Sequence, residues 1–192
     1  MEEIQSVGAF IGLAIGDAMG APLEGLPPRS IAVTEMLGGG IHNTLPGQYT
    51  DDTLQASALA ETLIHCGGFD ADDFAGRLLR VYHAHPEFFG PTSGAVLDLI
   101  GSGEKPEVAA ARVHEMRGGS RSNGSVMRGI AIGIFYPQGE VRAASLAASR
   151  ATHFDPAAGE ASAVVNRIVS GICRGEERED AFTEALDGCQ DA

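Results

Sequence analysis

The sequence Thr-Asp-Asp-Thr at residues 50–53 opens a segment with helical apolar spacing. Thr50 is expected to be the N-cap of a helix, with Asp51 and Asp52 in its first turn. One interpretation is a charged cap, because acidic side chains gain ~0.3–1 kcal/mol near a helix N-terminus. The other is half of a metal site, because Mg²⁺ and Mn²⁺ prefer carboxylate and hydroxyl oxygens. The residues alone leave both interpretations open.

A second segment of chemical interest is the Gly-Gly-Ser-Arg-Ser-Asn run at residues 118–123. The glycines allow unusual backbone angles, so that successive N–H groups can turn toward an anion. The serines and the asparagine add hydrogen-bond donors, and the following helix N-terminus adds a favourable dipole. This pattern suits a diphosphate, although such loops before helices are usually simple turns and caps.

Length and composition limit the classes of protein. The 192 residues predict one domain, and a net charge of −13 without a Lys/Arg cluster argues against binding to nucleic acid or an anionic membrane. No basic-then-apolar leader opens the chain, and Gly and Asp interrupt its apolar stretches, so no membrane span is expected. Three cysteines without CxxC spacing are typical of a reducing cytoplasm.

The apolar spacing is helical almost throughout. Helices are predicted near residues 4–20, 50–66, 70–83, 93–100, 106–116, 124–135, 140–150, 157–173 and 178–188. A Pro/Gly-rich connection at 25–49 is long enough to be a functional loop. The sequence therefore predicts an all-α protein, a compact orthogonal helical bundle with Gly-rich loops that forms a single domain over residues 1–192.

Four segments in register resemble the ADP-ribosylglycohydrolase family, which includes dinitrogenase reductase-activating glycohydrolases, ADP-ribosyl-acceptor hydrolases and crystallin J1 relatives. They are GLAIGDAMGAPLEG at 12–25, YTDDT at 49–53, GGSRSNGSVMR at 118–128 and ATHFDP at 151–156. The resemblance implies an all-α fold, a pair of Mg²⁺ or Mn²⁺ ions, and hydrolysis of the bond that joins ADP-ribose to an acceptor.

The resemblance also implies roles for individual residues. It assigns the metal to Thr50, Asp51 and Asp52, and proton transfer from the attacking water to Glu24, Asp51 or Asp52. The residues implied in ligand binding, chiefly of the diphosphate, are Gly119, Ser120, Arg121, Ser122, Asn123 and His153. The family often has an aromatic residue and a glycine where this chain has Arg121 and Ser122.

Three further residues receive structural interpretations. Asp17 is expected to orient the adjoining loops through its carboxylate oxygens. Asp155 is expected to cap the helix that begins at Pro156. Arg128 is expected to form an ion pair near the site.

One family feature is not found in this sequence. The chain resembles the N-terminal two-thirds of a family member and contains no second Asp-x-Asp motif followed by Thr or Ser. A two-metal site needs carboxylates from both sides. We therefore expect either a partner, as a homo-oligomer or a complementing second chain, or a catalytically degenerate ADP-ribose-binding or crystallin-like structural protein. Helices that would pack against further chain are expected to expose apolar surface.

Overall fold

The computed structural model describes residues 3–27 and 33–187, and this part of the chain is helical without named strands. The predicted all-α class is therefore confirmed. The α-helices are α1 (Glu3–Gly20), α2 (Asp51–Cys66), α3 (Ala71–Ala84), α4 (Pro91–Gly101), α5 (Pro106–Arg117), α6 (Ile130–Phe135), α7 (Gln138–Arg150), α8 (Pro156–Cys173) and α9 (Arg178–Asp187). Short 3₁₀ helices lie at η1 (Ala21–Leu23), η2 (Pro86–Phe88) and η3 (Asn123–Ser125).

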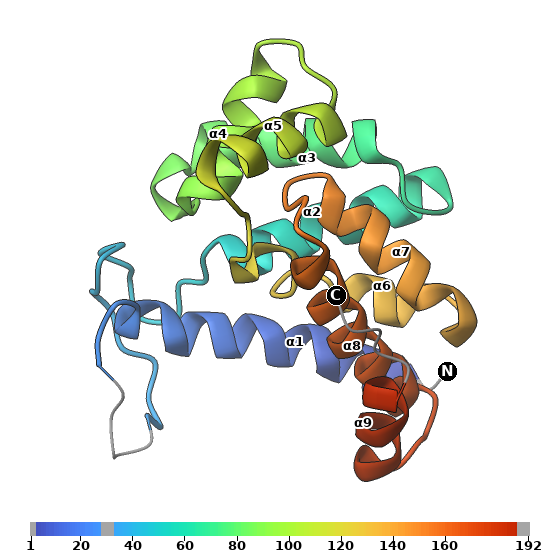
Figure 1. Ribbon diagram of the computed structural model, residues 1–192. Helices are drawn as coiled ribbons and strands as arrows, with labels where there is room; N and C mark the ends of the chain where they lie inside the picture. The colour runs from blue at the N-terminus through green and yellow to red at the C-terminus, as the bar shows by residue number, and fades with distance from the viewer. Residues whose placement is uncertain (1–2, 28–32, 188–192) are drawn as a thin grey trace.

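The helices pack around α2 (Figure 1). In this view α1 runs below α2, α3, α4 and α5 form the upper part, and α9 extends below α8. The main core joins α2, α3, α6 and α7 through Leu59, Leu63, Phe74, Leu78, Ile132 and Val141. A smaller apolar cluster holds α4 against α5. The main core thus holds α2 against α3, α6 and α7 through its apolar face.

Helix boundaries follow the local sequence closely. Gly67 and Gly118 end α2 and α5 in the left-handed conformation that favours glycine. Asp70 caps α3 by accepting a hydrogen bond from the Asp73 N–H. Asp155 caps α8 in the same way, ahead of Pro156, as the sequence predicts.

The predicted helix at 124–135 is wrong in its first half. The 3₁₀ helix η3 and a turn replace it, and α6 begins only at Ile130. Gly129 lies so close to α8 that a Cβ there would be 2.5 Å from the Asn166 Oδ1 atom. The turn that permits this approach also directs Arg128 into the interior.

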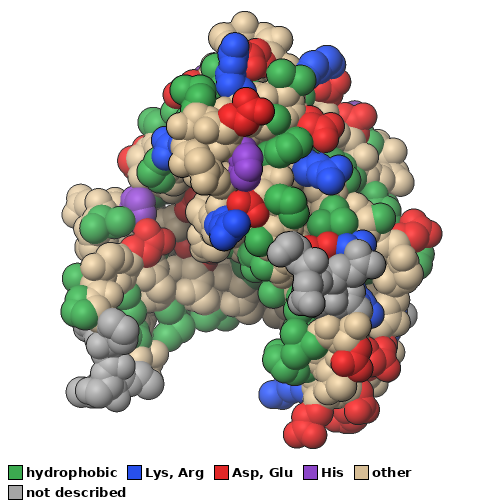
Figure 2. Space-filling model, in the orientation of Figure 1, with side chains coloured by type: hydrophobic (Ala, Val, Ile, Leu, Met, Phe, Trp, Pro, Cys, Tyr) green, Lys and Arg blue, Asp and Glu red, His purple; other side chains and the backbone are tan. Residues whose placement is uncertain are grey.

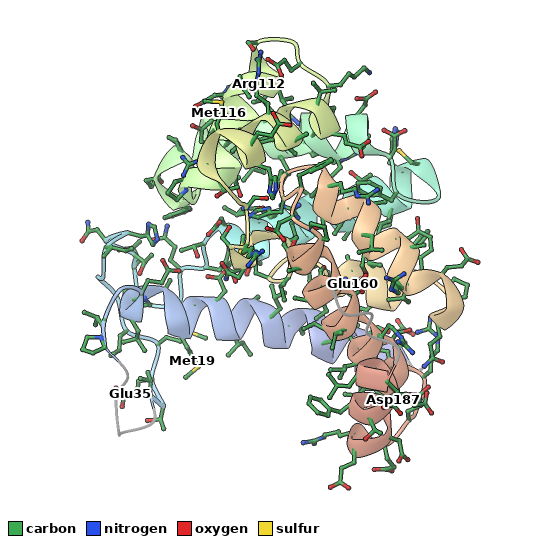
Figure 3. All side chains as sticks on the ribbon, in the orientation of Figure 1. Met19, Glu35, Arg112, Met116, Glu160 and Asp187 are labelled. Carbon is green, nitrogen blue, oxygen red and sulfur yellow. The ribbon has the colours of Figure 1, made fainter. Side chains whose placement is uncertain are left out.

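The apolar stripe of α1 lies largely at the surface. Ile4, Val7 and Ile11 are exposed, and Met19 points away from the other helices (Figure 3). A groove of about 430 Å³ between α1, α2 and α6 is lined almost wholly by apolar side chains, including Phe10 and Phe135. The expected exposure of apolar surface is therefore confirmed.

By length and composition alone, Glu3–Leu23 is also the one described segment that could cross a membrane. Such a segment is weak evidence, because helices of soluble proteins and signal sequences share these properties. The sequence-based expectation of no membrane span stays a prediction.

Charge is spread over the surface. On the face shown in Figure 2, the Lys and Arg side chains stand apart from one another, and acidic side chains lie between them. This agrees with the absence of a Lys/Arg cluster in the sequence. Cys66 and Cys173 are free thiols, and Cys189 lies outside the described residues.

Candidate functional site

The first turn of α2 is capped by a side chain from α1. Thr50 occupies the N-cap position, as predicted, but its own side chain accepts no capping hydrogen bond. Instead, the Asp17 carboxylate accepts hydrogen bonds from the backbone N–H and the hydroxyl of both Thr50 and Thr53, at 2.6–3.0 Å. The expected structural role of Asp17 is therefore confirmed.

Two neighbouring carboxyl groups follow this cap. Asp51 is 8% exposed, and its Oδ2 accepts a hydrogen bond of 2.9 Å from the Gln55 amide. Burial, followed by repulsion from Asp52 and Glu24, raises the pKa of Asp51 to about 7. Burial, followed by repulsion from Asp17 and Glu24, raises the pKa of Asp52 to about 6. The ionised pair is thus held in an unfavourable environment that a cation would relieve.

The donor chemistry of this turn fits a hard divalent cation. Two carboxylates and the Thr50 hydroxyl are oxygen ligands, and Thr50 directs its hydrogen toward Asp17, which leaves oxygen lone pairs for a metal. Among the described residues, no three His, Cys, Asp or Glu side chains gather into a metal-ligating group. Asp51 and Asp52 would therefore supply only part of a coordination shell.

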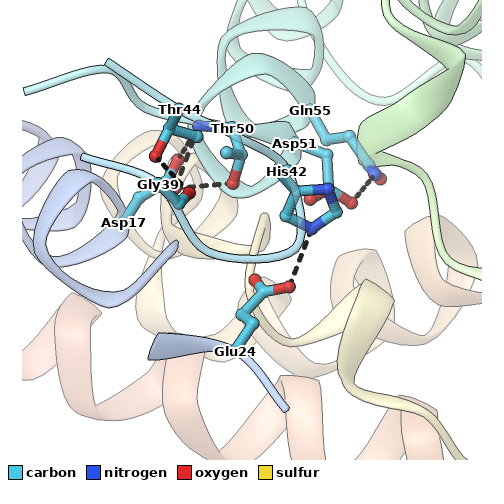
Figure 4. Close-up of polar contacts among 8 residues, drawn as sticks. All are labelled: Asp17, Glu24, Gly39, His42, Thr44, Thr50, Asp51 and Gln55. Atoms are coloured by element: carbon cyan, nitrogen blue, oxygen red, sulfur yellow. Dashed lines mark hydrogen bonds and ion pairs between the residues drawn. The ribbon is translucent and has the colours of Figure 1, made fainter. Parts of the chain in front are cut away.

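Glu24 lies across the site from α2 at the end of η1 (Figure 4). Its Oε2 atom is 2.9 Å from Nε2 of His42, and the His42 ring meets Phe88 edge-on at 5.5 Å. Glu24 raises the pKa of both Asp51 and Asp52 by its charge. His42 thus holds Glu24 at a position from which its charge acts on both aspartates.

Arg128 is fully buried behind the carboxylate pair. Its guanidinium donates to the Gln55 Oε1 at 3.0 Å, the Ala148 carbonyl at 3.1 Å and the Thr152 hydroxyl at 2.7 Å, and it lies 5.0 Å from the centre of the Phe74 ring. Burial lowers the pKa of Arg128 to about 9. Among the described residues, no carboxylate lies within ion-pair distance of it. The expectation of an ion pair is therefore wrong, and neutral groups solvate this cation.

The glycines of the 118–123 loop end a helix. Gly118 has φ +67° and Gly119 has φ +145°. Their N–H groups donate to the carbonyls of Glu115 and His114, which closes α5. The expectation that these two N–H groups turn toward an anion is therefore wrong. The predicted contact of Gly119 with a ligand stays a prediction.

Ser120 is tied into the fold as well. Its hydroxyl accepts the Asp155 N–H at 3.0 Å and lies 3.0 Å from Nδ1 of His114. It therefore joins the end of α5 to the start of α8, and its predicted role in ligand binding stays a prediction.

The outer residues of the loop face solvent. The Arg121 side chain is 79% exposed, and its Nε donates to the Asp155 Oδ2 at 3.0 Å. Ser122 and Asn123 are exposed beside it. Of the predicted ligand-binding residues, these three offer polar side chains to the outside of the loop.

His153 lies directly beneath the loop and is 1% exposed. Its Nε2 atom is 2.7 Å from the Ser122 hydroxyl and its Nδ1 atom is 2.8 Å from the Thr152 hydroxyl. Burial, aided by the charge of Arg128, lowers the pKa of His153 to about 3, so the ring is neutral. Gly124 permits the close approach, because a Cβ there would be 2.5 Å from Cε1 of the ring.

Hydrogen bonds connect the predicted metal and diphosphate residues through Arg128 and through two side chains that the sequence did not single out, Gln55 and Thr152. Gln55 lies four residues after Asp51 on the same helix, and this spacing is a usable signal. Thr152 precedes His153 in the ATHFDP segment. His42 lies in a loop without periodicity, where no sequence pattern pointed to it.

Comparison with known proteins identifies the family of this chain. The family description ADP-ribosylglycohydrolase matches residues 4–192. An ADP-ribosylarginine hydrolase Tri1 of Serratia proteamaculans is 33% identical over 92% of this chain and 49% of its own length. An ADP-ribosyl-[dinitrogen reductase] glycohydrolase of Rhodospirillum rubrum is 29% identical over 94% of this chain and 62% of its own length.

A solved chain gives the same result at the level of structure. A protein described as an ADP-ribosylglycohydrolase-related protein complex superimposes with a TM-score of 0.79 and 34% identity, covering 95% of this chain and 60% of that one. The chain spans about half the length of the curated relatives it matches. The helical fold, the four motifs in register and the family match over residues 4–192 together place this chain in the ADP-ribosylglycohydrolase family.

Proposed function

We propose that this protein hydrolyses the bond between ADP-ribose and an acceptor group, with Mg²⁺ or Mn²⁺ at Thr50, Asp51 and Asp52. The observation that carries the proposal is the Asp51–Asp52 pair, buried at Asp51 and half-buried at Asp52, which Asp17 and Glu24 surround with further negative charge. Carboxylates that repel one another in a buried site have a strong affinity for a divalent cation.

The ion would supply charge neutralisation and Lewis acidity to the reacting sugar. Asp17 holds the first turn of α2, so that Asp51 and Asp52 stay in place as ligands. Glu24, held by His42, is positioned beside them to accept a proton from the attacking water, a role that Asp51 or Asp52 can also take. Arg121, Ser122 and Asn123 would contact the diphosphate from the loop.

The direct test is release of ADP-ribose from peptides ADP-ribosylated on arginine or serine, with Mg²⁺ or Mn²⁺ supplied. Asp51→Asn should reduce the rate by about a thousandfold, as expected when ~4 kcal/mol of transition-state stabilisation is lost. Glu179→Gln with Asp180→Asn is the matched control, because these two acids begin α9 in the same way. Equal loss of rate in both variants would contradict a specific role for the α2 pair.

Metal binding is tested separately by titrating Mn²⁺ calorimetrically into the metal-free chain. The wild type should release or absorb heat on binding, whereas the variant carrying Asp51→Ala and Asp52→Ala should not. Identical isotherms for the two proteins would remove the metal assignment.

The second candidate is a non-catalytic ADP-ribose-binding or structural protein. It is favoured by one observation, that no three metal-ligating side chains gather among the described residues. In that case the protein binds ADP-ribose but releases none from ADP-ribosylated peptides at any concentration of Mg²⁺ or Mn²⁺. Under either function, we propose that the exposed α1 face and its groove are covered by further polypeptide, as a second copy or a complementing chain.

A further inference from the structure

The buried Arg128 connects two arms of hydrogen bonds that run in opposite directions. One arm passes through the Gln55 side chain to Asp51, and the other passes through Thr152 and His153 to Ser122. Each contact is between 2.7 and 3.0 Å, so every step is a normal hydrogen bond.

The direction of the first arm follows from Arg128. A guanidinium has only donors, so its Nη1 fixes the Gln55 Oε1 as the acceptor. The Gln55 amide nitrogen then points at Asp51 and donates to it. A reversed Gln55 amide would place its NH₂ group against the Arg128 guanidinium, donor against donor, and its carbonyl oxygen against the Asp51 carboxylate, acceptor against acceptor.

The direction of the second arm follows in the same way. Arg128 Nη2 donates to the Thr152 hydroxyl, whose single hydrogen is left for one acceptor. Thr152 is buried, and among the described residues its other contact is Nδ1 of His153. The opposite arrangement would leave a buried O–H without an acceptor, which is unfavourable.

The tautomer of His153 then determines the direction of the Ser122 hydroxyl hydrogen. Because the His153 ring is neutral and Nδ1 accepts from Thr152, its one N–H is at Nε2 and donates to the Ser122 oxygen. The hydrogen of the Ser122 hydroxyl is thereby directed away from the ring. Since Ser122 is exposed on the loop, that hydrogen faces the ligand side.

We propose that Arg128, Thr152 and His153 are positioning residues that present the Ser122 hydroxyl as a hydrogen-bond donor, selecting an anionic phosphate oxygen of the ligand. That the ligand is ADP-ribose rests on the proposed function. The order of donors along the arm does not depend on it. With the opposite order, Ser122 would donate inward to the ring and offer a bound ligand only an acceptor.

The first experiment needs no ligand. The metal-free chain is labelled with ¹⁵N-histidine, and long-range ¹⁵N–¹H correlation spectra report the tautomer of each ring. The His153 signals are assigned as those that disappear in His153→Asn. We expect the Nε2–H tautomer in the wild type and in Thr152→Ser. Thr152→Val removes the donor that fixes Nδ1 as an acceptor and should lower the population of the Nε2–H tautomer, because Ser122 can then donate inward to Nε2. An Nδ1–H tautomer or a charged ring in the wild type at neutral pH would overturn the inference.

The second experiment measures affinity for ADP-ribose and adenosine. Loss of one charge-assisted hydrogen bond weakens binding by about tenfold or more. Thr152→Val and Ser122→Ala should each lower the affinity for ADP-ribose by this factor. The variant with both substitutions should bind ADP-ribose no more weakly than Ser122→Ala alone. Thr152→Ser should bind within about twofold of the wild type. Adenosine affinity should not change in any of them.

Thr183→Val on α9 is the matched control, because this hydroxyl bonds only within its own helix. Additive losses in the double variant would contradict transmission through Ser122. A wild type with the Nε2–H tautomer but no affinity for ADP-ribose would refute the proposed function and the phosphate ligand, while the donor order would stand. If Thr152→Val fails to fold, the wild-type tautomer and Thr152→Ser still decide the donor order.

Discussion

The pKa of Asp51 makes a specific prediction for the pH dependence of stability. The folded carboxyl has a pKa of about 7 against 3.8 for the ordinary group. A raised folded-state pKa adds stability that is fully present below about pH 3.8 and is lost as pH rises through about 7. Between about pH 8 and pH 5 the free energy of unfolding should gain about 2.5 kcal/mol from this group, at ~1.4 kcal/mol per pH unit of differential protonation.

The assay is urea unfolding of wild type and Asp51→Asn in chelator, across about pH 5 to 8. Asn cannot ionise and retains an oxygen for the Gln55 amide, so the variant should lose this gain and be the more stable protein near pH 8. The lowered pKa of His153 changes the free energy of unfolding in the opposite direction, because its stabilising contribution is lost as pH falls below about 6.5. Both proteins contain His153, so this contribution cancels in the difference between them.

Two controls sharpen this measurement. Asp72→Asn removes an exposed carboxylate that pairs with Lys105 and should leave the pH profile nearly parallel to wild type. Saturating Mn²⁺ should stabilise wild type most near pH 8, where both carboxylates are ionised. Parallel curves for wild type and Asp51→Asn would falsify the argument that this carboxylate is held in an unfavourable charge environment.

Three further outcomes are expected. Gly124→Ala should destabilise the chain by about 1–3 kcal/mol, because its Cβ would overlap the His153 ring, whereas Gly139→Ala on α7 meets no atom and should be neutral or stabilising, as thermal melting will show. Asp17→Ala should cost about 2–4 kcal/mol and increase hydrogen exchange at the first turn of α2, whose N–H groups it caps; unchanged exchange there would contradict that role. Arg121→Ala should weaken ADP-ribose binding in calorimetry with less than about 1 kcal/mol change in stability, since the Arg121 side chain is exposed and Asp155 keeps its hydrogen bond from the Ala157 N–H.

The sequence predicted the helices well because most are delimited by local chemistry. Asp70, Asp155 and the glycines at 67 and 118 act within a few residues of the helix ends that they define. The error at 124–135 arose because Gly129 is required by contact with α8, a tertiary constraint with no local pattern. Helical periodicity alone could not anticipate that turn.

In the candidate site, too, local motifs were predicted from the sequence and contacts between distant segments were not. The acidic pair on α2 and the histidine of ATHFDP were identified from motifs. Thr50 was placed correctly at the N-cap of α2, but the side chain that caps the helix is Asp17, 33 residues earlier in the sequence. Arg128 was expected to meet a carboxylate, since the sequence does not reveal that neutral oxygens surround it. Contacts between distant segments are what the sequence could not provide.

The bonds between Asp17 and Thr50 also close the base of the connection between η1 and α2. A loop whose two ends are already joined changes its closure entropy slowly with length, by about 0.6 kcal/mol for each doubling. Residues inserted near the middle of this connection should therefore leave the carboxylates of α2 undisturbed. The length of the connection can therefore vary while Asp17 keeps the first turn of α2, and with it Asp51 and Asp52, in place.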